Sequence, residues 1–188
     1  MTTTKTTTAL TELTGQYTLD PTHTSIGFLA RHAMVTKVRG SFNEFEAAVV
    51  LDGDDPSRSS ASVTIAVDSI DTRNEQRDAH LRSNDFLDLE NHPQITFVST
   101  SARRVDDATF ELTGDLTIKG VTRPVTVAFE YEGAAKDPYG NLRVGFEGSA
   151  TISRKDFGIT WNAALETGGV LVSDKIVLEF DVSAIKNA

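Results

Sequence analysis

The sequence contains no cysteine, which excludes disulfide bonds, thiol nucleophiles and metal sites with cysteine ligands. It has one tryptophan and three tyrosines, so its ten phenylalanines supply most of the aromatic side chains, and they carry no polar group. Its 18 Lys and Arg residues are outnumbered by 27 Asp and Glu residues, and the net charge of −9 disfavours binding to nucleic acid. It also lacks an apolar run of about 18 residues, so no transmembrane segment is expected.

The 188 residues have an ordinary globular composition, with 39% hydrophobic and 24% charged residues, which predicts one domain. Residues 1–15 are rich in threonine and have little apolar surface to bury, so we expect a flexible tail followed by a domain over residues 16–188. The tail shows no leader pattern. The sequence as written therefore predicts a cytoplasmic protein, or a periplasmic or exported one if a leader has been removed.

Apolar and polar residues alternate along most of the chain after residue 16, which is typical of strands with one buried face. The alternating segments lie near residues 25–30, 40–51, 60–70, 95–97, 110–118, 125–131, 142–152 and 176–182. They predict an all-β fold of about eight antiparallel strands, closed as a barrel or packed as a sandwich. An eight-stranded barrel is either filled by its side chains or holds one small ligand, and alternation does not decide between these cases.

Three irregularities interrupt this pattern. The alternation slips between Phe42 and Phe45, which predicts a bulge. A capping box with Thr72 as N-cap and Glu75 predicts a short helix that ends at Arg82. Residues 162–169 predict a second short helix, with an asparagine cap and two closing glycines. We expect both helices at the rim of the barrel.

Catalytic and metal-binding signatures are missing from the sequence. The four histidines are scattered without the spacing of metal ligands, and there is no Gly-x-Ser-x-Gly motif or glycine-rich phosphate loop. Basic residues concentrate in residues 73–82. This concentration has two interpretations: a polar opening that meets a ligand head group, or a solvated helix whose charges form local ion pairs. Arg31 and His32 leave the same two interpretations open. The turn at residues 154–158 is expected to be locked by Arg154 and Asp156.

A series of short motifs occurs in a fixed order along the chain. The motifs are HTSIGFLARH (23–32), VRGSFNEF (38–45), SIDT (69–72), RDAHLRSNDF (77–86), HP (92–93), FVST (97–100), GDLTIKGVTRPV (114–125), DPYG (137–140) and RKDFG (154–158) with Asn162. The series resembles the YceI-like family. The resemblance covers about residues 17–182, and each motif alone is weak while the series is specific.

The resemblance implies a lipocalin-like, eight-stranded antiparallel β-barrel that holds an isoprenoid lipid in an apolar tunnel. The lipid is implied as a class: a polyprenyl chain, an isoprenoid quinone or a polyprenyl phosphate, bound non-covalently and without a further cofactor. The family has no shared catalytic motif, so we expect a carrier rather than an enzyme. Two alternatives stay open: an enzyme acting on such a lipid through His32 or His80, and a filled barrel that serves as a stress-related interaction module. A homodimer is also possible.

Each buried methylene of a prenyl chain contributes about 0.8 kcal/mol, so a long apolar bore suffices for binding. The side chains expected to line this bore are Phe28, Phe42, Phe45, Ile65, Phe97, Leu116, Ile118, Phe129, Phe146, Trp161, Leu178 and Phe180. The residues expected to form a polar opening are Arg31, His32, Arg77, His80 and Arg82.

Overall fold

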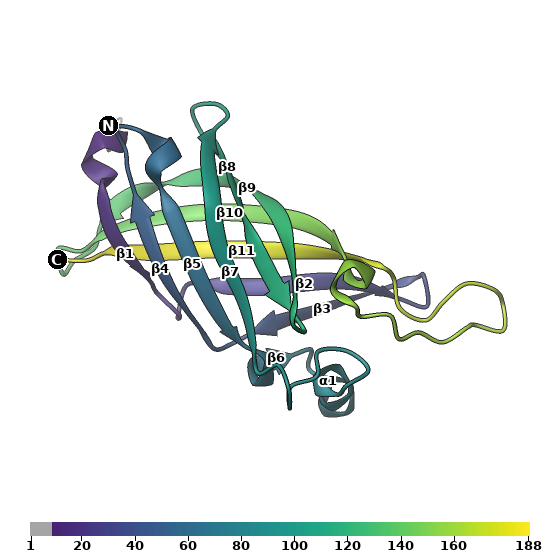
Figure 1. Ribbon diagram of the computed structural model, residues 1–188. Helices are drawn as coiled ribbons and strands as arrows, with labels where there is room; N and C mark the ends of the chain where they lie inside the picture. Colours follow the sequence, from purple (N-terminus) through teal and green to yellow (C-terminus); the bar gives the residue numbers. More distant parts are fainter. Residues whose placement is uncertain (1–8) are drawn as a thin grey trace, which may run out of the picture.

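We describe residues 9–188 of a computed structural model of the chain (Figure 1). Within these residues the chain forms eleven strands, one α-helix and four short 3-10 helices. The strands are β1 (Gly15–Leu19), β2 (Ser25–His32), β3 (Thr36–Phe42), β4 (Phe45–Leu51), β5 (Ser60–Ala66), β6 (Ile70–Asp71), β7 (Gln94–Arg104), β8 (Thr109–Ile118), β9 (Val121–Lys136), β10 (Leu142–Ser153) and β11 (Lys175–Lys186). The helices are η1 (Leu10–Leu13), η2 (Pro56–Arg58), η3 (Val67–Ser69), α1 (Glu75–Arg82) and η4 (Arg154–Phe157). None of these helices is long and apolar enough to cross a membrane.

The sheet closes on itself as an antiparallel barrel of eight strands. Its order is β1-β4-β5-β7-β8-β9-β10-β11, and β1 pairs with both β4 and β11 to close the ring. The remaining strands, β2, β3 and β6, extend the ring, because β2 continues along β11 beyond β1 and β3 pairs with β2 and β6. The prediction of an eight-stranded antiparallel barrel with a helix at its rim is confirmed.

Two breaks give the extra strands. Residues 20–24 separate β1 from β2, and Asn43 and Glu44 separate β3 from β4. The predicted bulge between Phe42 and Phe45 is therefore a full strand break, after which β4 pairs with β1 and β5. Both phenylalanines still pack against the main core, so the break keeps the two inward residues on the same side of the wall.

The two ends of the barrel are built from different segments (Figure 1). The termini end carries η1, the C-terminus, the 52–59 loop, the 105–108 hairpin and the 137–141 turn. The helix end carries the β2–β3 turn, residues 67–93 with α1, the 119–120 turn and residues 154–174. The core follows this division: one cluster centres on Phe86, Ile95 and Phe157, and the other on Leu13, Tyr17 and Val144.

Helix α1 is present and ends at Arg82, as predicted, but its N-cap is Asn74. The Asn74 side chain accepts from the Arg77 amide at 2.9 Å. The predicted cap, Thr72, is buried instead and donates its backbone and hydroxyl hydrogens to the Asp78 carboxylate. The assignment of Thr72 as N-cap is therefore wrong, because a buried carboxylate within α1 takes that side chain.

The predicted helix over residues 162–169 is also wrong. These residues form an irregular loop with an isolated bridge between Ala164 and Val170. The Asn162 amide does not cap a helix, because it donates to the Val172 carbonyl at 2.8 Å and accepts from the Val172 amide at 3.0 Å. The side chain thus pairs with the returning strand-like segment in place of a helical turn.

The predicted tail over residues 1–15 is ordered in part. Residues 1–8 lie outside the described residues. Residues Leu10–Leu13 form η1, in which Leu13 is buried, and Gly15 begins β1. The Tyr17 hydroxyl donates to the Leu13 carbonyl at 2.8 Å and ties η1 to the barrel.

Candidate functional site

An apolar cavity of about 360 Å³ runs through the barrel. Leu10, Gly53 and Pro56 line it at the termini end, and Leu81, Phe86 and Val172 line it at the helix end. A volume of this size is within the range of small-molecule sites, and such sites are mostly apolar. The cavity thus extends between the two ends along the inward faces of the strands.

The alternation seen in the sequence explains the apolar wall. Inward positions on β8 are Phe110, Leu112, Leu116 and Ile118, and those on β11 are Ile176, Leu178, Phe180 and Val182. Because successive side chains of a strand point to opposite faces, one apolar set faces the cavity while its polar partners face solvent. The cavity wall is therefore a direct consequence of the period-2 pattern.

Inward glycines make room for several phenylalanine rings. A Cβ atom at Gly148 would lie 2.5 Å from the Phe129 ring, and one at Gly114 would lie 2.5 Å from the Phe97 ring. Gly40 stands in the same relation to Phe28, its partner on β2, at 2.3 Å. Each ring therefore lies over a neighbouring glycine along the wall rather than extending fully across the bore.

Aromatic rings also contact one another along the cavity. Phe129 and Phe146 pack edge-on at 6.3 Å between ring centroids, and Phe129 and Phe180 pack at 6.1 Å. Tyr131 also packs against Phe146, with 5.4 Å between ring centroids. These contacts hold the rings in defined positions and give one wall of the cavity a continuous aromatic surface.

Three charged residues, Asp52, Glu111 and Arg154, are part of the lining. Arg154 is the most buried of them, with 4% of its surface exposed. Its guanidinium donates to four backbone carbonyls, those of Ile159 (2.9 Å), Trp161 (2.9 Å), Val172 (3.3 Å) and Ser173 (2.9 Å). Arg154 therefore holds residues 159–173 against the end of β10.

The charge of Arg154 is only weakly compensated. The Asp174 carboxylate lies 3.7 Å from its guanidinium and is half exposed. Burial lowers the pKa of Arg154 from its ordinary value, and Asp174 opposes that shift. The expected lock with Asp156 is not formed; instead the Asp156 carbonyl accepts from the Arg123 side chain at 3.2 Å.

Ten of the twelve predicted lining residues lie on the cavity wall. They are Phe28, Phe42, Ile65, Phe97, Leu116, Ile118, Phe129, Phe146, Leu178 and Phe180. Phe45 and Trp161 are instead packed against the core beside it. Leu10 and Leu13 also line the cavity, although the tail prediction had placed them outside the domain.

The five residues predicted to form a polar opening are all at the helix end, but they do not form one group. Arg31 and His32 are exposed at the end of β2. Arg77 donates to the hydroxyl and carbonyl of Thr72, at 2.8 and 2.7 Å. Arg82 donates to the carbonyls of Asp68 (3.1 Å) and Ile70 (3.3 Å).

His80 packs against an aromatic residue of the cavity wall. Its ring packs edge-on against Phe86, at 5.0 Å, and against Trp161, at 4.7 Å. Its Nε2 atom lies 2.9 Å from the Asp85 carboxylate. Because Phe86 lines the cavity, His80 lies one ring behind the cavity wall. Within residues 9–188, no cluster of three or more His, Asp or Glu side chains is arranged to hold a metal ion.

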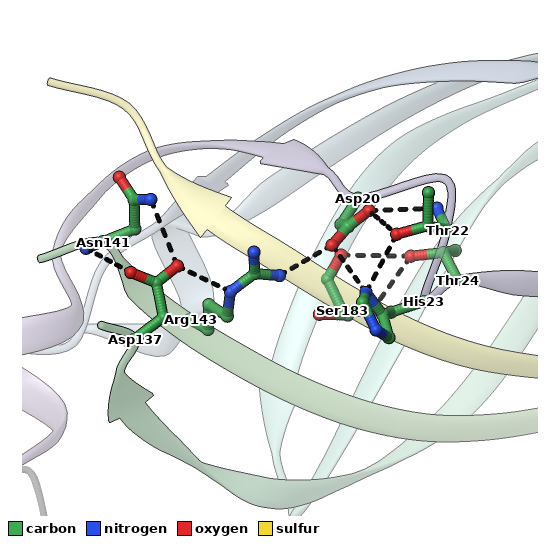
Figure 2. Close-up of polar contacts among 8 residues, drawn as sticks. All are labelled: Asp20, Thr22, His23, Thr24, Asp137, Asn141, Arg143 and Ser183. Carbon is green, nitrogen blue, oxygen red and sulfur yellow. Dashed lines mark hydrogen bonds and ion pairs between the residues drawn. The ribbon is translucent and has the colours of Figure 1, made fainter. Parts of the chain in front are cut away.

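The termini end carries a separate ion-pair network (Figure 2). Arg143 donates to Asp20 at 2.7 Å and to Asp137 at 2.9 Å, and the Asp20 carboxylate also contacts Thr22 and His23. The hydrogen bond from Arg143, with those from Thr22 and His23, holds the pKa of Asp20 well below its ordinary range. This network joins the β1–β2 break to the β9–β10 turn.

Comparison with known proteins identifies the family of this barrel. The sequence profile of the YceI-like domain matches residues 17–184. The chain belongs to the YceI-like domain family. UPF0312 proteins of two staphylococci are similar in sequence to this chain over nearly their whole length. The protein of Staphylococcus aureus is 41% identical over 169 residues, which are 89% of this chain and 95% of the relative. The protein of Staphylococcus epidermidis is 42% identical over 172 residues, which are 90% and 95% of the two chains.

Solved structures show the same YceI-like barrel. Burkholderia cenocepacia BcnA superposes with a TM-score of 0.77 at 25% identity, covering 88% of this chain and 98% of that one. The Campylobacter jejuni YCEI protein superposes with a TM-score of 0.73 at 30% identity, covering 84% and 90%. A polyisoprenoid binding domain from Saccharophagus degradans shares the fold, with a TM-score of 0.69 at 12% identity, covering 91% and 98%.

Proposed function

We propose that this YceI-like protein binds an isoprenoid lipid in the barrel cavity and shields it from water or carries it. The observation that supports this most strongly is the wall of the cavity, which is predominantly apolar and runs between both ends of the barrel. A cavity of this kind favours a ligand-holding barrel over a filled one. The polyisoprenoid binding domain from Saccharophagus degradans has the same fold, which supports a prenyl ligand for such a barrel.

The dimensions of the barrel suit a long flexible chain. Strand β11 has twelve residues and spans about 40 Å, and it follows the cavity for most of its length. Each methylene buried from water contributes about 0.8 kcal/mol, offset in part by the entropy of ordering the chain. Binding therefore needs few polar contacts, which agrees with the scarcity of charged residues in the lining.

An enzyme acting on an isoprenoid lipid is the second candidate. His80 supports it, because its ring contacts Phe86 of the cavity wall and its Nε2 atom pairs with Asp85. His32 is exposed on β2, and its backbone bridges to Val172, which lines the cavity. Turnover of a prenyl lipid that is lost in His80→Ala or His32→Ala, while lipid binding survives, would favour this candidate. Absence of turnover with any isoprenoid would exclude it.

Native mass spectrometry after incubation with a polyprenol tests the proposed carrier function. We expect a complex of one lipid with the wild-type protein and loss of that complex in Leu116→Arg, because Leu116 is buried on the cavity wall. Val98→Arg is the matched control, since Val98 lies on the outer face of the neighbouring strand β7 and is 53% exposed. A wild-type protein that takes up no polyprenyl lipid, or a folded Leu116→Arg variant with unchanged uptake, would contradict the proposal.

A further inference from the structure

The β2–β3 turn and the 162–173 loop project together from the helix end (Figure 1). The Ala33 amide donates to the Leu171 carbonyl at 2.7 Å, and the Ser173 amide donates to the Arg31 carbonyl at 3.0 Å. His32 and Val172 form an isolated bridge between the two segments. The turn and the loop therefore form one projecting unit, bonded through the backbone.

This unit presents three exposed apolar side chains: Met34 is 64% exposed, Val35 77% and Val170 40%. We call these three residues the apolar tip. They are neighbours, because Met34 lies across Gly169, where its sulfur would be 2.2 Å from an added Cβ atom. Single exposed apolar residues are common on protein surfaces, but a cluster on a projecting turn is typical of an interaction site.

The backbone conformation of the turn indicates that local stability does not account for its apolar residues. Ala33 and Met34 have φ angles of 51° and 63°, and the Val35 amide donates to the His32 carbonyl at 3.1 Å. A two-residue turn with both φ angles positive strongly favours Asn-Gly, because other residues crowd their own backbone there. Ala and a bulky exposed Met therefore occupy a position that local stability would give to other residues, which is typical of functional sites.

The charges on the β2–β3 side of the apolar tip are positive, although the whole chain has a net charge of −9 and the 162–173 loop carries one acidic residue, Glu166. Residues 31–39 contain Arg31, Lys37 and Arg39 and no acidic residue. Arg39 pairs with Glu179, but Arg31 and Lys37 face each other as cross-strand partners, and neither forms an ion pair within the described residues. Like charges in direct opposition are destabilising unless an anionic partner relieves them.

We propose that the apolar tip and the Arg31–Lys37 pair dock this protein onto an anionic lipid bilayer. Apolar side chains that enter the headgroup region and lysine or arginine side chains that meet anionic lipids are the two contributions that hold a peripheral protein on a membrane. Ala30 lines the cavity two residues before the end of β2 at His32, where the turn that carries Met34 begins. Docking would thus bring the helix end of the cavity to the membrane, and this role rests on the proposed function.

Vesicle flotation tests the docking with vesicles of phosphatidylcholine and about 30 mol% phosphatidylglycerol, against vesicles of phosphatidylcholine alone. We expect the wild-type protein to float with the anionic vesicles and to be released by high salt. Met34→Asn with Val35→Thr should weaken binding by about tenfold or more, because it removes the apolar side chains of the turn. Since asparagine suits a left-handed turn, this variant should keep or raise the melting temperature.

The matched controls lie at the termini end. Val105→Thr and Tyr139→Asn remove exposed apolar side chains from two other turns, at 47% and 88% exposure, and should leave flotation unchanged. Arg31→Gln with Lys37→Gln should weaken binding to the anionic vesicles and leave binding to phosphatidylcholine vesicles unchanged. Uptake of farnesol in solution, without vesicles, measures the cavity separately and should be normal in the tip variant and in the Val105→Thr and Tyr139→Asn controls.

The outcomes separate docking from the proposed function. A wild-type protein that does not float, or a tip variant that floats like the wild type, would overturn the docking proposal. A tip variant that changes only the oligomeric state in solution would overturn it too, and would assign the apolar tip to a second copy of this chain. Tip-dependent flotation without farnesol uptake would keep the docking surface and reject the lipid-carrying function.

Discussion

The charged groups at the two ends of the barrel have different partners. At the termini end, Arg143 lies between Asp20 and Asp137, and each charge is matched by another within the chain (Figure 2). At the helix end, Arg154 is held by backbone carbonyls, and Arg31 and Lys37 oppose each other in solvent. The Arg143 network therefore satisfies its own charges. At the helix end His80 and Arg82 are paired with Asp85 and Asp68, but the opposed Arg31 and Lys37 have no ion-pair partner within the described residues. We infer that the first end secures the barrel and the second exchanges the ligand.

The largest effects are expected from the buried aromatic residues, and they test whether both ends are equally well packed. Phe157 at the helix end and Tyr17 at the termini end are each 1% exposed. Phe157→Ala and Tyr17→Ala should each lower the free energy of unfolding by about 3–5 kcal/mol, because both leave a large cavity. Chemical denaturation measures this. A loss below about 1 kcal/mol in Phe157→Ala alone would show a loosely packed helix end.

A smaller effect is expected from Arg154→Met, which keeps the side-chain length but removes the donors to residues 159–173. We expect a loss of about 3 kcal/mol, since an unsatisfied buried carbonyl costs about 1–3 kcal/mol and water replaces only some of the donors. Hydrogen exchange should accelerate in residues 159–173 and stay unchanged in β1 and β4. Lys155→Met, at a neighbouring half-exposed side chain, is the control and should change stability by less than about 0.5 kcal/mol. Equal acceleration at both ends would contradict a local role for Arg154.

The sequence predicted the barrel because alternation determines which residues face inward, and ten of the twelve residues predicted to line the bore lie on the cavity wall. It did not predict the break at residues 20–24, because that break depends on β1 and β2 sharing one partner, β11. The role of Arg154 was missed since its partners are backbone carbonyls, which carry no signal in the sequence. Trp161 was expected in the bore, but its ring packs on His80 and Phe86 beside it.

The smallest effect is expected from acid, and it tests the termini end alone. Hydrogen bonds from Asn141, Arg143 and Tyr139 outweigh burial and lower the pKa of Asp137 to about 2, against about 3.9 in the unfolded chain. Between these values the unfolded state binds more protons, so the stabilisation present above about pH 4 is lost as the pH falls toward 2.

Asp137→Asn removes this titration, so its melting temperature should fall less than that of the wild type between about pH 4.5 and pH 2. Asp107→Asn is the control, because Asp107 is fully exposed at the 105–108 hairpin, and it should follow the wild type. Thermal denaturation across this range provides the measurement. If Asp137→Asn followed the wild-type curve, the network would not secure the termini end.

The most direct test of the account measures the longest polyprenol that the protein retains, by native mass spectrometry with a series of increasing chain length. Ala102 lines the cavity near the termini end and Ala30 near the helix end. If the chain enters at the helix end, Ala102→Trp will shorten the longest polyprenol retained and leave short ones bound, whereas Ala30→Trp will slow the uptake of every length. The reverse pattern, or retention that neither variant changes, would contradict a cavity that is entered from the helix end.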